Sequence, residues 1–232
     1  MAKQLSPRPR PPVARRHPPA ARPPTRRRGP LPVLLAAAAA VAVIVGVVLA
    51  IGLASDDEPG SPPAAGVAET RPVEAEGTGL APFESPADDP AVGRAVPEVR
   101  GAAFDGTPVE IVADGRPKLV MFVAHWCPHC QEEVPVIVDW LAAGAPQGVD
   151  LVAVSTAVSA DQPNYPPSAW LEDEGWTVPT LADDADQTAA SAFGLTSFPY
   201  FVAVGSDGTV AARAAGEKTV AELEALVAAA RR

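Results

Sequence analysis

The 232-residue sequence has few cysteines, few aromatic side chains and an uneven distribution of charge. Its two cysteines, Cys127 and Cys130, stand close together, so no others remain to form structural disulfides. Residues 1–54 contain nine Lys/Arg and no acidic residue, whereas residues 55–232 contain nine Lys/Arg and 28 Asp/Glu. The second part therefore has a formal charge of −19. This charge argues against nucleic acid as a partner, because phosphates require a positive surface.

Residues 31–54 form an uncharged, apolar stretch of 24 residues. As a helix it would measure about 36 Å, enough to cross a hydrocarbon core of about 30 Å. Basic residues precede it and acidic residues follow it, so the positive-inside rule predicts a cytoplasmic N-terminus and an extracytoplasmic domain. A cleavable signal peptide is the alternative, since Gly52-Leu53-Ala54 resembles a cleavage site, but its apolar region would be only about 7–15 residues long. We therefore expect a single-pass protein of the cell membrane.

Two segments of low complexity flank this predicted transmembrane helix. Residues 1–30 contain nine prolines and eight arginines, and we interpret them as a disordered cytoplasmic tail, because this composition buries too little surface to fold. Residues 55–93 contain seven prolines, five glycines and nine acidic residues, and we interpret them as an acidic, proline-rich linker. Eleven of the twelve aromatic residues follow, so residues 94–232 are predicted to form one globular domain.

The pattern of apolar residues after the linker is typical of an α/β domain. The runs 118–124 and 149–155 are continuously apolar, as expected for strands that are buried on both faces. A helix is predicted over residues 128–143, and a last helix begins at Thr219, whose capping partner is Glu222. Shorter strands are expected at 99–104, 109–112, 178–181, 200–204 and 210–213, and helices at 167–174 and 186–193. Strands that alternate with helices predict an α/β fold.

The two cysteines form a Cys-x-x-Cys motif at the start of the predicted helix. Free backbone N–H groups and the helix dipole stabilise an anion at a helix N-terminus. Cys127 is therefore expected to be an exposed nucleophilic thiolate. Cys130, one turn further along the helix, is expected to be the buried thiol that resolves a mixed disulfide. Pro128 and His129 lie between them, and a cationic His129 would further favour the thiolate form of the nucleophile.

Other uses of this motif are less consistent with the sequence. A structural disulfide across so short a loop would restrict the unfolded chain very little. Copper or zinc handling is a more serious alternative, because two cysteines and two histidines lie within the segment HWCPHC. Zinc ligands usually come in pairs from separate segments, however, and the third histidine, His17, lies across the predicted membrane. Covalent haem attachment needs a histidine where Gln131 stands. We expect no metal and no cofactor, with His125 at the solvent-exposed rim.

From about residue 98 to residue 232 the sequence resembles thioredoxin. The landmarks are the WCxxC of Trp126 to Cys130, Pro135 in the following helix, the segment Gly194 to Pro199, and the spacing of Gly208 and Gly216. The resemblance implies a central mixed sheet flanked by helices, a helix kinked at Pro135 and a cis peptide bond at Pro199. It also implies that Trp126, Phe198 and Pro199 contact the polypeptide substrate.

The chain between Cys130 and Pro199 is longer than in thioredoxin, and this insertion is similar to that of the membrane-anchored TlpA/ResA-type branch. The Pro-His dipeptide is similar to that of the disulfide oxidase DsbA. Met121 stands where thioredoxin has a buried carboxylate, so the role of proton acceptor is unassigned.

We therefore predict thiol–disulfide exchange on exported proteins, with a redox partner that recycles the cysteine pair. The residues favour an oxidant, although the body of the sequence resembles reductases. A redoxin-type peroxidase is a further alternative, but its reactive cysteine usually lies outside a Cys-x-x-Cys motif.

Overall fold

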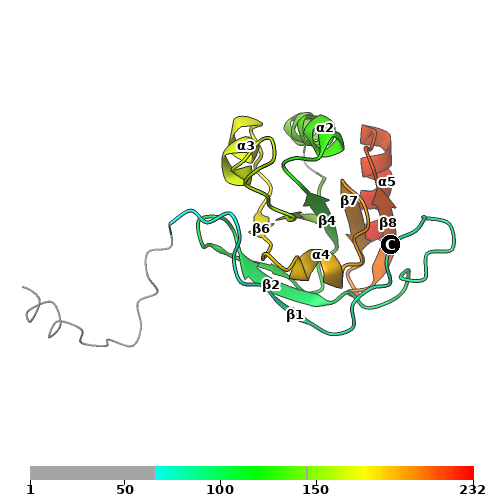
Figure 1. Cartoon of the computed structure of the whole chain (residues 1–232). Helices are drawn as coiled ribbons and strands as arrows, with labels where there is room; N and C mark the ends of the chain where they lie inside the picture. The colour runs from blue at the N-terminus through cyan, green and yellow to red at the C-terminus, as the bar shows by residue number, and fades with distance from the viewer. Residues whose placement is uncertain (1–65, 145) are drawn as a thin grey trace, which may run out of the picture. The chain divides into compact units, whose positions relative to one another are not determined.

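The computed structural model describes residues 66–144 and 146–232 (Figure 1). The predicted cytoplasmic tail, the apolar stretch 31–54 and the first part of the linker lie outside the described residues. Among the residues that are described, no helix is both long and apolar enough to cross a membrane. The transmembrane helix at residues 31–54 therefore stays a prediction.

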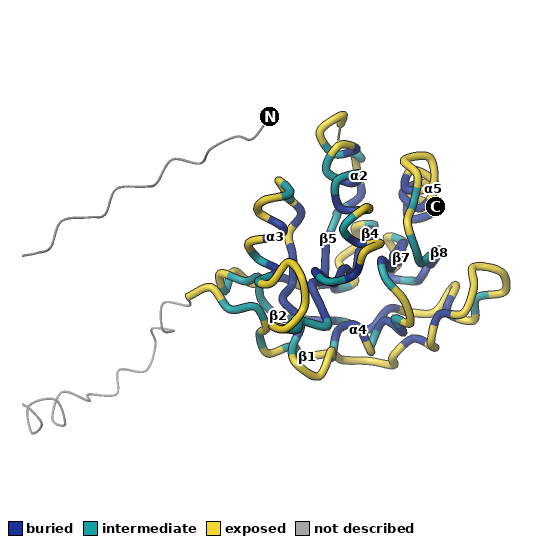
Figure 2. The backbone as a smooth tube through the Cα atoms, turned by 45° about the horizontal axis from the view of Figure 1, so that its top comes forward, coloured by how far each residue is buried: buried dark blue, intermediate teal, exposed yellow. Residues whose placement is uncertain are grey.

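A five-stranded mixed sheet forms the centre of the described domain, with the strand order β6-β5-β4-β7-β8. The central strand β4 (Lys118–Val123) runs parallel to β5 (Asp150–Ser155) and antiparallel to β7 (Tyr200–Val204). At the edges, β6 (Thr180–Ala182) pairs in parallel with β5, and β8 (Val210–Ala215) pairs antiparallel with β7. Every residue of β4 and β7 is buried (Figure 2), because both faces of the sheet are covered. The predicted mixed sheet is confirmed.

Helices cover the central sheet on both sides. They are α2 (Pro128–Gly144), α3 (Pro167–Asp173), α4 (Thr188–Ala192) and α5 (Val220–Ala230). As predicted, Pro135 lies inside α2. Helix α5 begins with the predicted capping box, in which Thr219 Oγ1 accepts the Glu222 N–H at 3.3 Å and the Glu222 carboxylate accepts the Thr219 N–H at 2.8 Å. Two backbone donors at the start of this helix are thereby satisfied.

Two hydrophobic clusters lie on opposite faces of the sheet. The first joins Leu119 of β4 to Ile137 of α2 and Leu223 of α5. The second joins Phe122 of β4 to Phe193 after α4 and to a separate three-stranded antiparallel sheet. The strands of this second sheet are β1 (Glu74–Glu76), β2 (Glu98–Ala102) and β3 (Pro108–Ile111). In Figure 1, accordingly, α2 and α5 lie on one side of the central sheet, and α4 lies with β1 and β2 on the other.

Residues 66–93 pack on the domain, which corrects the predicted linker over 55–93 and the predicted boundary at residue 94. Leu80, Phe83 and Ala91 are buried in the second cluster, although prolines, glycines and acidic residues surround them. The guanidinium of Arg213 donates from Nε to Asp89 Oδ2 at 2.7 Å, and both side chains are almost fully buried. A few widely spaced apolar residues attach this irregular segment to the domain. Its average composition is polar and rich in proline, so composition alone did not reveal that it packs.

Candidate active site

The two cysteines lie where β4 ends and α2 begins. Cys127 immediately precedes α2, and its carbonyl accepts the N–H of Cys130 at 3.0 Å and of Gln131 at 3.1 Å. Both cysteines are free thiols in this structure. Cys127 is 6% exposed and Cys130 is fully buried, so Cys127 is less accessible than predicted. The reason is that Trp126 and Phe198 pack against the cluster that contains both cysteines.

Cys130 is enclosed by the protein on all sides. Its Sγ accepts the backbone N–H of Ala124 at 3.4 Å. Burial raises the pKa of the Cys130 thiol far above its ordinary value, and the neighbouring Cys127 and Glu133 raise it further. The Cys130 thiol therefore stays protonated in the resting protein, and it must pass its proton to an acceptor before it can attack a disulfide.

Glu133, which is not among the predicted site residues, lies one turn after Cys130 in α2 and is 1% exposed. Burial raises the pKa of its carboxyl to about 7. Its Oε2 accepts the backbone N–H of Lys218 at 2.7 Å, whereas its Oε1 has no hydrogen-bond partner among the described residues. A buried carboxyl with a pKa near neutrality and an unused oxygen is suited to accept the Cys130 proton. The three-residue spacing from Cys130 is the signal that could have identified it.

Pro128 and His129, the two residues between the cysteines, are exposed at the start of α2. The Nδ1 atom of His129 lies 2.6 Å from Glu217 Oε1. Glu217 belongs to the loop between β8 and α5, far away in the sequence, and nothing in the local pattern around the cysteines indicates it. The imidazole that was expected to favour the thiolate is therefore bonded to a carboxylate.

The three residues predicted to contact a substrate come together beside the cysteines. Trp126 and Phe198 form an edge-to-face pair, with ring centroids 5.9 Å apart and an interplanar angle of 82°. The peptide bond between Phe198 and Pro199 is cis, as the resemblance implied. Trp126 also donates its indole N–H to the carbonyl of Ala157 at 2.7 Å, which ties the active site to the inserted segment between α2 and Pro199.

His125 is fully buried, so the prediction of a solvent-exposed rim residue is wrong. Its Nδ1 lies 2.6 Å from the carbonyl oxygen of Pro163, and the backbone N–H of Ser159 donates to its Nε2 at 3.2 Å. A carbonyl only accepts and an amide N–H only donates, so the ring is held as the neutral Nδ1–H tautomer. The ring of Tyr165 packs edge-on against it at 6.0 Å. The inserted segment covers His125, and this contact between distant residues has no local sequence signal.

These contacts bear on the metal-binding alternative. Both ring nitrogens of His125 are occupied by backbone groups, and Nδ1 of His129 is bonded to Glu217. Within the described part of the chain, no group of three or more His, Cys, Asp or Glu side chains is placed to hold a metal ion. Three of the four histidine ring nitrogens in the HWCPHC segment are therefore already bonded to other protein groups.

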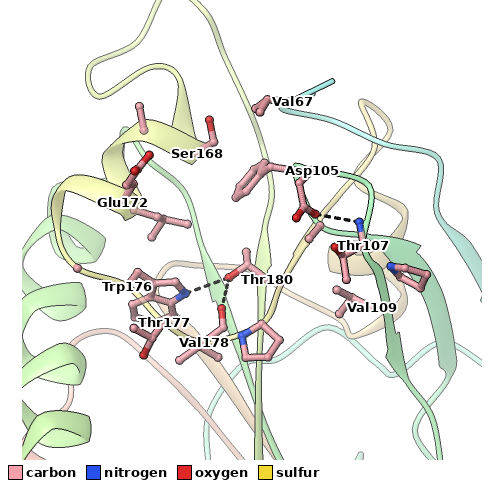
Figure 3. Close-up of a pocket in the computed structure, with 17 residues that line it drawn as sticks. Val67, Asp105, Thr107, Val109, Ser168, Glu172, Trp176, Thr177, Val178 and Thr180 are labelled. Carbon is pink, nitrogen blue, oxygen red and sulfur yellow. Dashed lines mark hydrogen bonds between the residues drawn. The ribbon is translucent and has the colours of Figure 1, made fainter. Parts of the chain in front are cut away.

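A cavity of about 840 Å³ in the described domain is lined by neither cysteine (Figure 3). Its walls come from the β2–β3 turn, α3 and the segment that leads into β6. Trp176 lines it and donates its indole N–H to Thr180 Oγ1 at 2.9 Å. None of the predicted site residues lines this cavity, so the candidate site is the surface around Cys127 and not a deep pocket.

A mixed sheet, a cysteine pair at a helix N-terminus and a cis-proline are together the features of thioredoxin-fold thiol–disulfide oxidoreductases. The chain belongs to the Redoxin family, whose sequence profile matches residues 91–227. This match confirms the resemblance to the thioredoxin superfamily.

Two of the similar curated proteins are methylamine utilization proteins MauD. The MauD of Methylobacillus flagellatus is 27% identical over 127 residues, which are 53% of this chain and 57% of that protein. The MauD of Paracoccus denitrificans is 29% identical over 127 residues, which are 53% of this chain and 58% of that protein. The chain thus spans less than two thirds of the length of the curated relatives it matches.

Among solved structures, a DsbF homologue from Corynebacterium diphtheriae superposes with a TM-score of 0.50 at 20% identity. The alignment covers 65% of this chain and 99% of that one. At this identity the likeness shows the fold, and it confirms the predicted thioredoxin-like α/β architecture.

Proposed function

We propose that the protein exchanges disulfides with exported proteins through Cys127 and Cys130. The observation that carries this proposal is the asymmetry of the pair: Cys130 is fully buried, whereas Cys127, at the N-terminus of α2, keeps some exposure. A pair arranged in this way separates the attacking thiol from the resolving thiol.

The exchange takes the following steps when a substrate disulfide is reduced. The Cys127 thiolate attacks one sulfur of a substrate disulfide, forms a mixed disulfide and releases the first substrate sulfur as a thiolate. Cys130 then transfers its proton to Glu133 and attacks the Cys127 sulfur, and the second substrate sulfur leaves. The products are a Cys127–Cys130 disulfide and two substrate thiolates, which become a dithiol by taking one proton from Glu133 and one from solvent. Oxidation of a substrate is the reverse sequence, in which Glu133 returns the proton to Cys130.

The substrate polypeptide binds across the surface formed by Trp126, Phe198 and Pro199. The aromatic pair offers an apolar surface next to Cys127, and the backbone of Phe198 lies just before the cis bond. An extended peptide that pairs with this backbone would bring a disulfide to the nucleophile largely through main-chain hydrogen bonds. Recognition of this kind depends little on substrate sequence.

The direction of exchange follows from how strongly the site stabilises the thiolate of Cys127. The N-terminus of α2 favours that thiolate, and a protonated His129 would add to this effect except where its bond to Glu217 offsets its charge. A stabilised thiolate stabilises the reduced form and raises the reduction potential. We therefore favour an oxidant. Equilibration of the protein with glutathione tests the direction: a potential at or below the thioredoxin value of about −270 mV would identify a reductase instead.

Reaction of the two thiols with an alkylating reagent tests the roles of the cysteines. In the reduced protein near neutral pH, Cys127 is expected to alkylate much faster, because Cys130 is buried and burial raises its pKa. A Cys130→Ser variant should accumulate mixed disulfides with cellular proteins, since no thiol remains to resolve them. The Cys127→Ser variant is the matched control and should accumulate few. Equal alkylation rates for the two thiols would contradict this assignment.

We further propose that residues 31–54 anchor the protein in the cell membrane with the catalytic domain on the extracytoplasmic side. The supporting observations are the 24-residue apolar length and the basic residues that precede it. On that side, a redox partner would recycle the cysteine pair. A topology reporter fused after Arg232 should be active only outside the cytoplasm, and cytoplasmic activity would reverse the orientation.

A further inference from the structure

We propose that Glu217 is a positioning residue for His129 that lowers the oxidising strength of the Cys127–Cys130 pair. This inference rests on the proposed disulfide exchange and names a residue that regulates it. Glu217 lies in the loop Gly216–Thr219, which joins β8 to α5. Its Oε1 is 2.6 Å from Nδ1 of His129, the residue directly before Cys130.

Three consecutive residues of this loop contact three different parts of the candidate site. Gly216 donates its backbone N–H to the carbonyl of Pro199 at 2.8 Å. Glu217 bonds to His129, and Lys218 donates its backbone N–H to Glu133 at 2.7 Å. The backbone on both sides of Glu217 is therefore held by the site itself. The His129 and Glu217 side chains are themselves 66% and 51% exposed, so the interaction is modest, as for other surface pairs, although the held backbone limits the positions that Glu217 can reach.

The beginning of α5 holds the same loop from its other side. Thr219, the residue after Lys218, caps α5 through its reciprocal hydrogen bonds with Glu222. Lys218 Nζ donates to the carbonyl oxygens of Ala215 and Glu217, at 2.8 and 2.9 Å, and so it satisfies two main-chain acceptors of this connection. The Glu217 carboxylate is thus directed to His129 by a loop whose own groups are already bonded.

The net charge of the His129–Glu217 pair affects how strongly the Cys127 thiolate is stabilised. A lone protonated imidazole beside Cys127 would bring one positive charge to the thiolate. With the Glu217 carboxylate bonded to it, the pair is neutral when the imidazole is protonated and carries one negative charge when it is not. In neither state does the pair bring a net positive charge. Glu217 therefore offsets the stabilisation that His129 would otherwise give to the thiolate, and hence to the reduced form.

Substitution of Glu217 by glutamine tests this inference with the full chain. The amide would retain an oxygen that accepts from the imidazole, while the negative charge is removed. At a fixed ratio of reduced to oxidised glutathione, we expect Glu217→Gln to shift the equilibrium constant two- to fivefold toward the dithiol. That shift equals a rise in potential of up to about 20 mV. The control is Glu74→Gln, which removes an exposed carboxylate from β1 in the other sheet and should leave the equilibrium unchanged.

The same substitution in a His129→Ala background separates action through His129 from a direct effect of charge. If Glu217 acts through the imidazole, the shift caused by Glu217→Gln should be clearly smaller in that background. An equal shift in both backgrounds, or no shift in the wild-type background, would overturn the inference. A wild-type protein whose cysteines do not equilibrate with glutathione at all would instead overturn the proposed function, so the two failures are distinguishable.

Discussion

The protonation of Glu133 bears both on the proposed chemistry of the site and on the stability of the domain. Its ordinary pKa of 4.5 is raised by burial to about 7. Between these two values the unfolded chain has lost the proton that the folded protein keeps, so the free energy of unfolding falls as the pH rises through this window. The difference between the two pKa values corresponds to a loss of at most about 3 kcal/mol in the free energy of unfolding.

Glu133→Gln should remove this pH dependence, because an amide does not titrate, and its oxygen still accepts the Lys218 N–H. Urea unfolding of the reduced protein at about pH 5 and about pH 8 measures the effect. From the lower to the higher pH, the free energy of unfolding should fall by up to about 3 kcal/mol more in the wild type than in the variant. Parallel pH profiles would show that Glu133 does not carry a proton in the folded protein. The variant should also resolve mixed disulfides more slowly, since Cys130 loses its proton acceptor.

At the scale of elements, the inserted segment that follows β5 is held against the active site by few but specific contacts. Ser159 donates to His125, Pro163 accepts from it, and the carbonyl of Ala157 accepts from Trp126. Because Trp126 precedes the nucleophile, these bonds connect the position of the insertion to the position of Cys127. Tyr165 belongs to the same segment, is 46% exposed and packs its ring edge-on against His125.

His125→Phe should release this segment while it preserves most of the buried volume. The amide of Ser159 and the carbonyl of Pro163 would lose their partners, at a cost of about 1–3 kcal/mol in the free energy of unfolding. Hydrogen exchange measures the local effect: the Ser159 amide should exchange much faster in the variant, whereas amides of β4 should change only with global stability. Unchanged protection at Ser159 would show that the segment does not depend on His125.

At the scale of the whole described domain, a buried ion pair fastens residues 66–93 to the central sheet. Arg213 of β8 bonds to Asp89, to the carbonyl of Ala81 at 2.8 Å and to the hydroxyl of Tyr200 at 3.1 Å. Its guanidinium also lies 5.3 Å from the ring centroid of Phe83. The buried guanidinium thus contacts several residues of an irregular segment. These contacts hold the segment on the domain.

Asp89→Asn should destabilise the domain by about 3–5 kcal/mol, because it leaves the buried charge of Arg213 without compensation. The guanidinium holds the pKa of Asp89 below its ordinary value, so this contribution should also be lost as acid protonates the carboxylate. Urea unfolding near neutral pH checks the loss. The neighbouring Asp88→Asn is a matched control, since Asp88 is exposed and its positive φ of 58° suits asparagine. Equal effects of the two substitutions would contradict a special role for Asp89.

Several features of the protein were determined by the sequence alone. The buried strands β4 and β5, the start of α2 at the cysteine pair and the capping box of Thr219 and Glu222 were all predicted correctly. Each depends on residues within a few positions of one another, through hydrophobic periodicity or local hydrogen bonding. The cis bond before Pro199 followed from resemblance to a family.

The tertiary structure alone decided what surrounds the cysteines. Lys218 bonds to Glu133 across 85 residues of sequence, Glu217 to His129 across 88, and Arg213 to Asp89 across 124. No local pattern indicates these partners, because the polarity of a charged residue is the same whether it faces water or is later enclosed. Only the folded chain shows that His125 and Glu133 are buried and that Glu217 reaches the active site. The cysteine motif could thus be predicted from the sequence, whereas the groups to which we assign an effect on its chemistry are brought to it by contacts between distant segments.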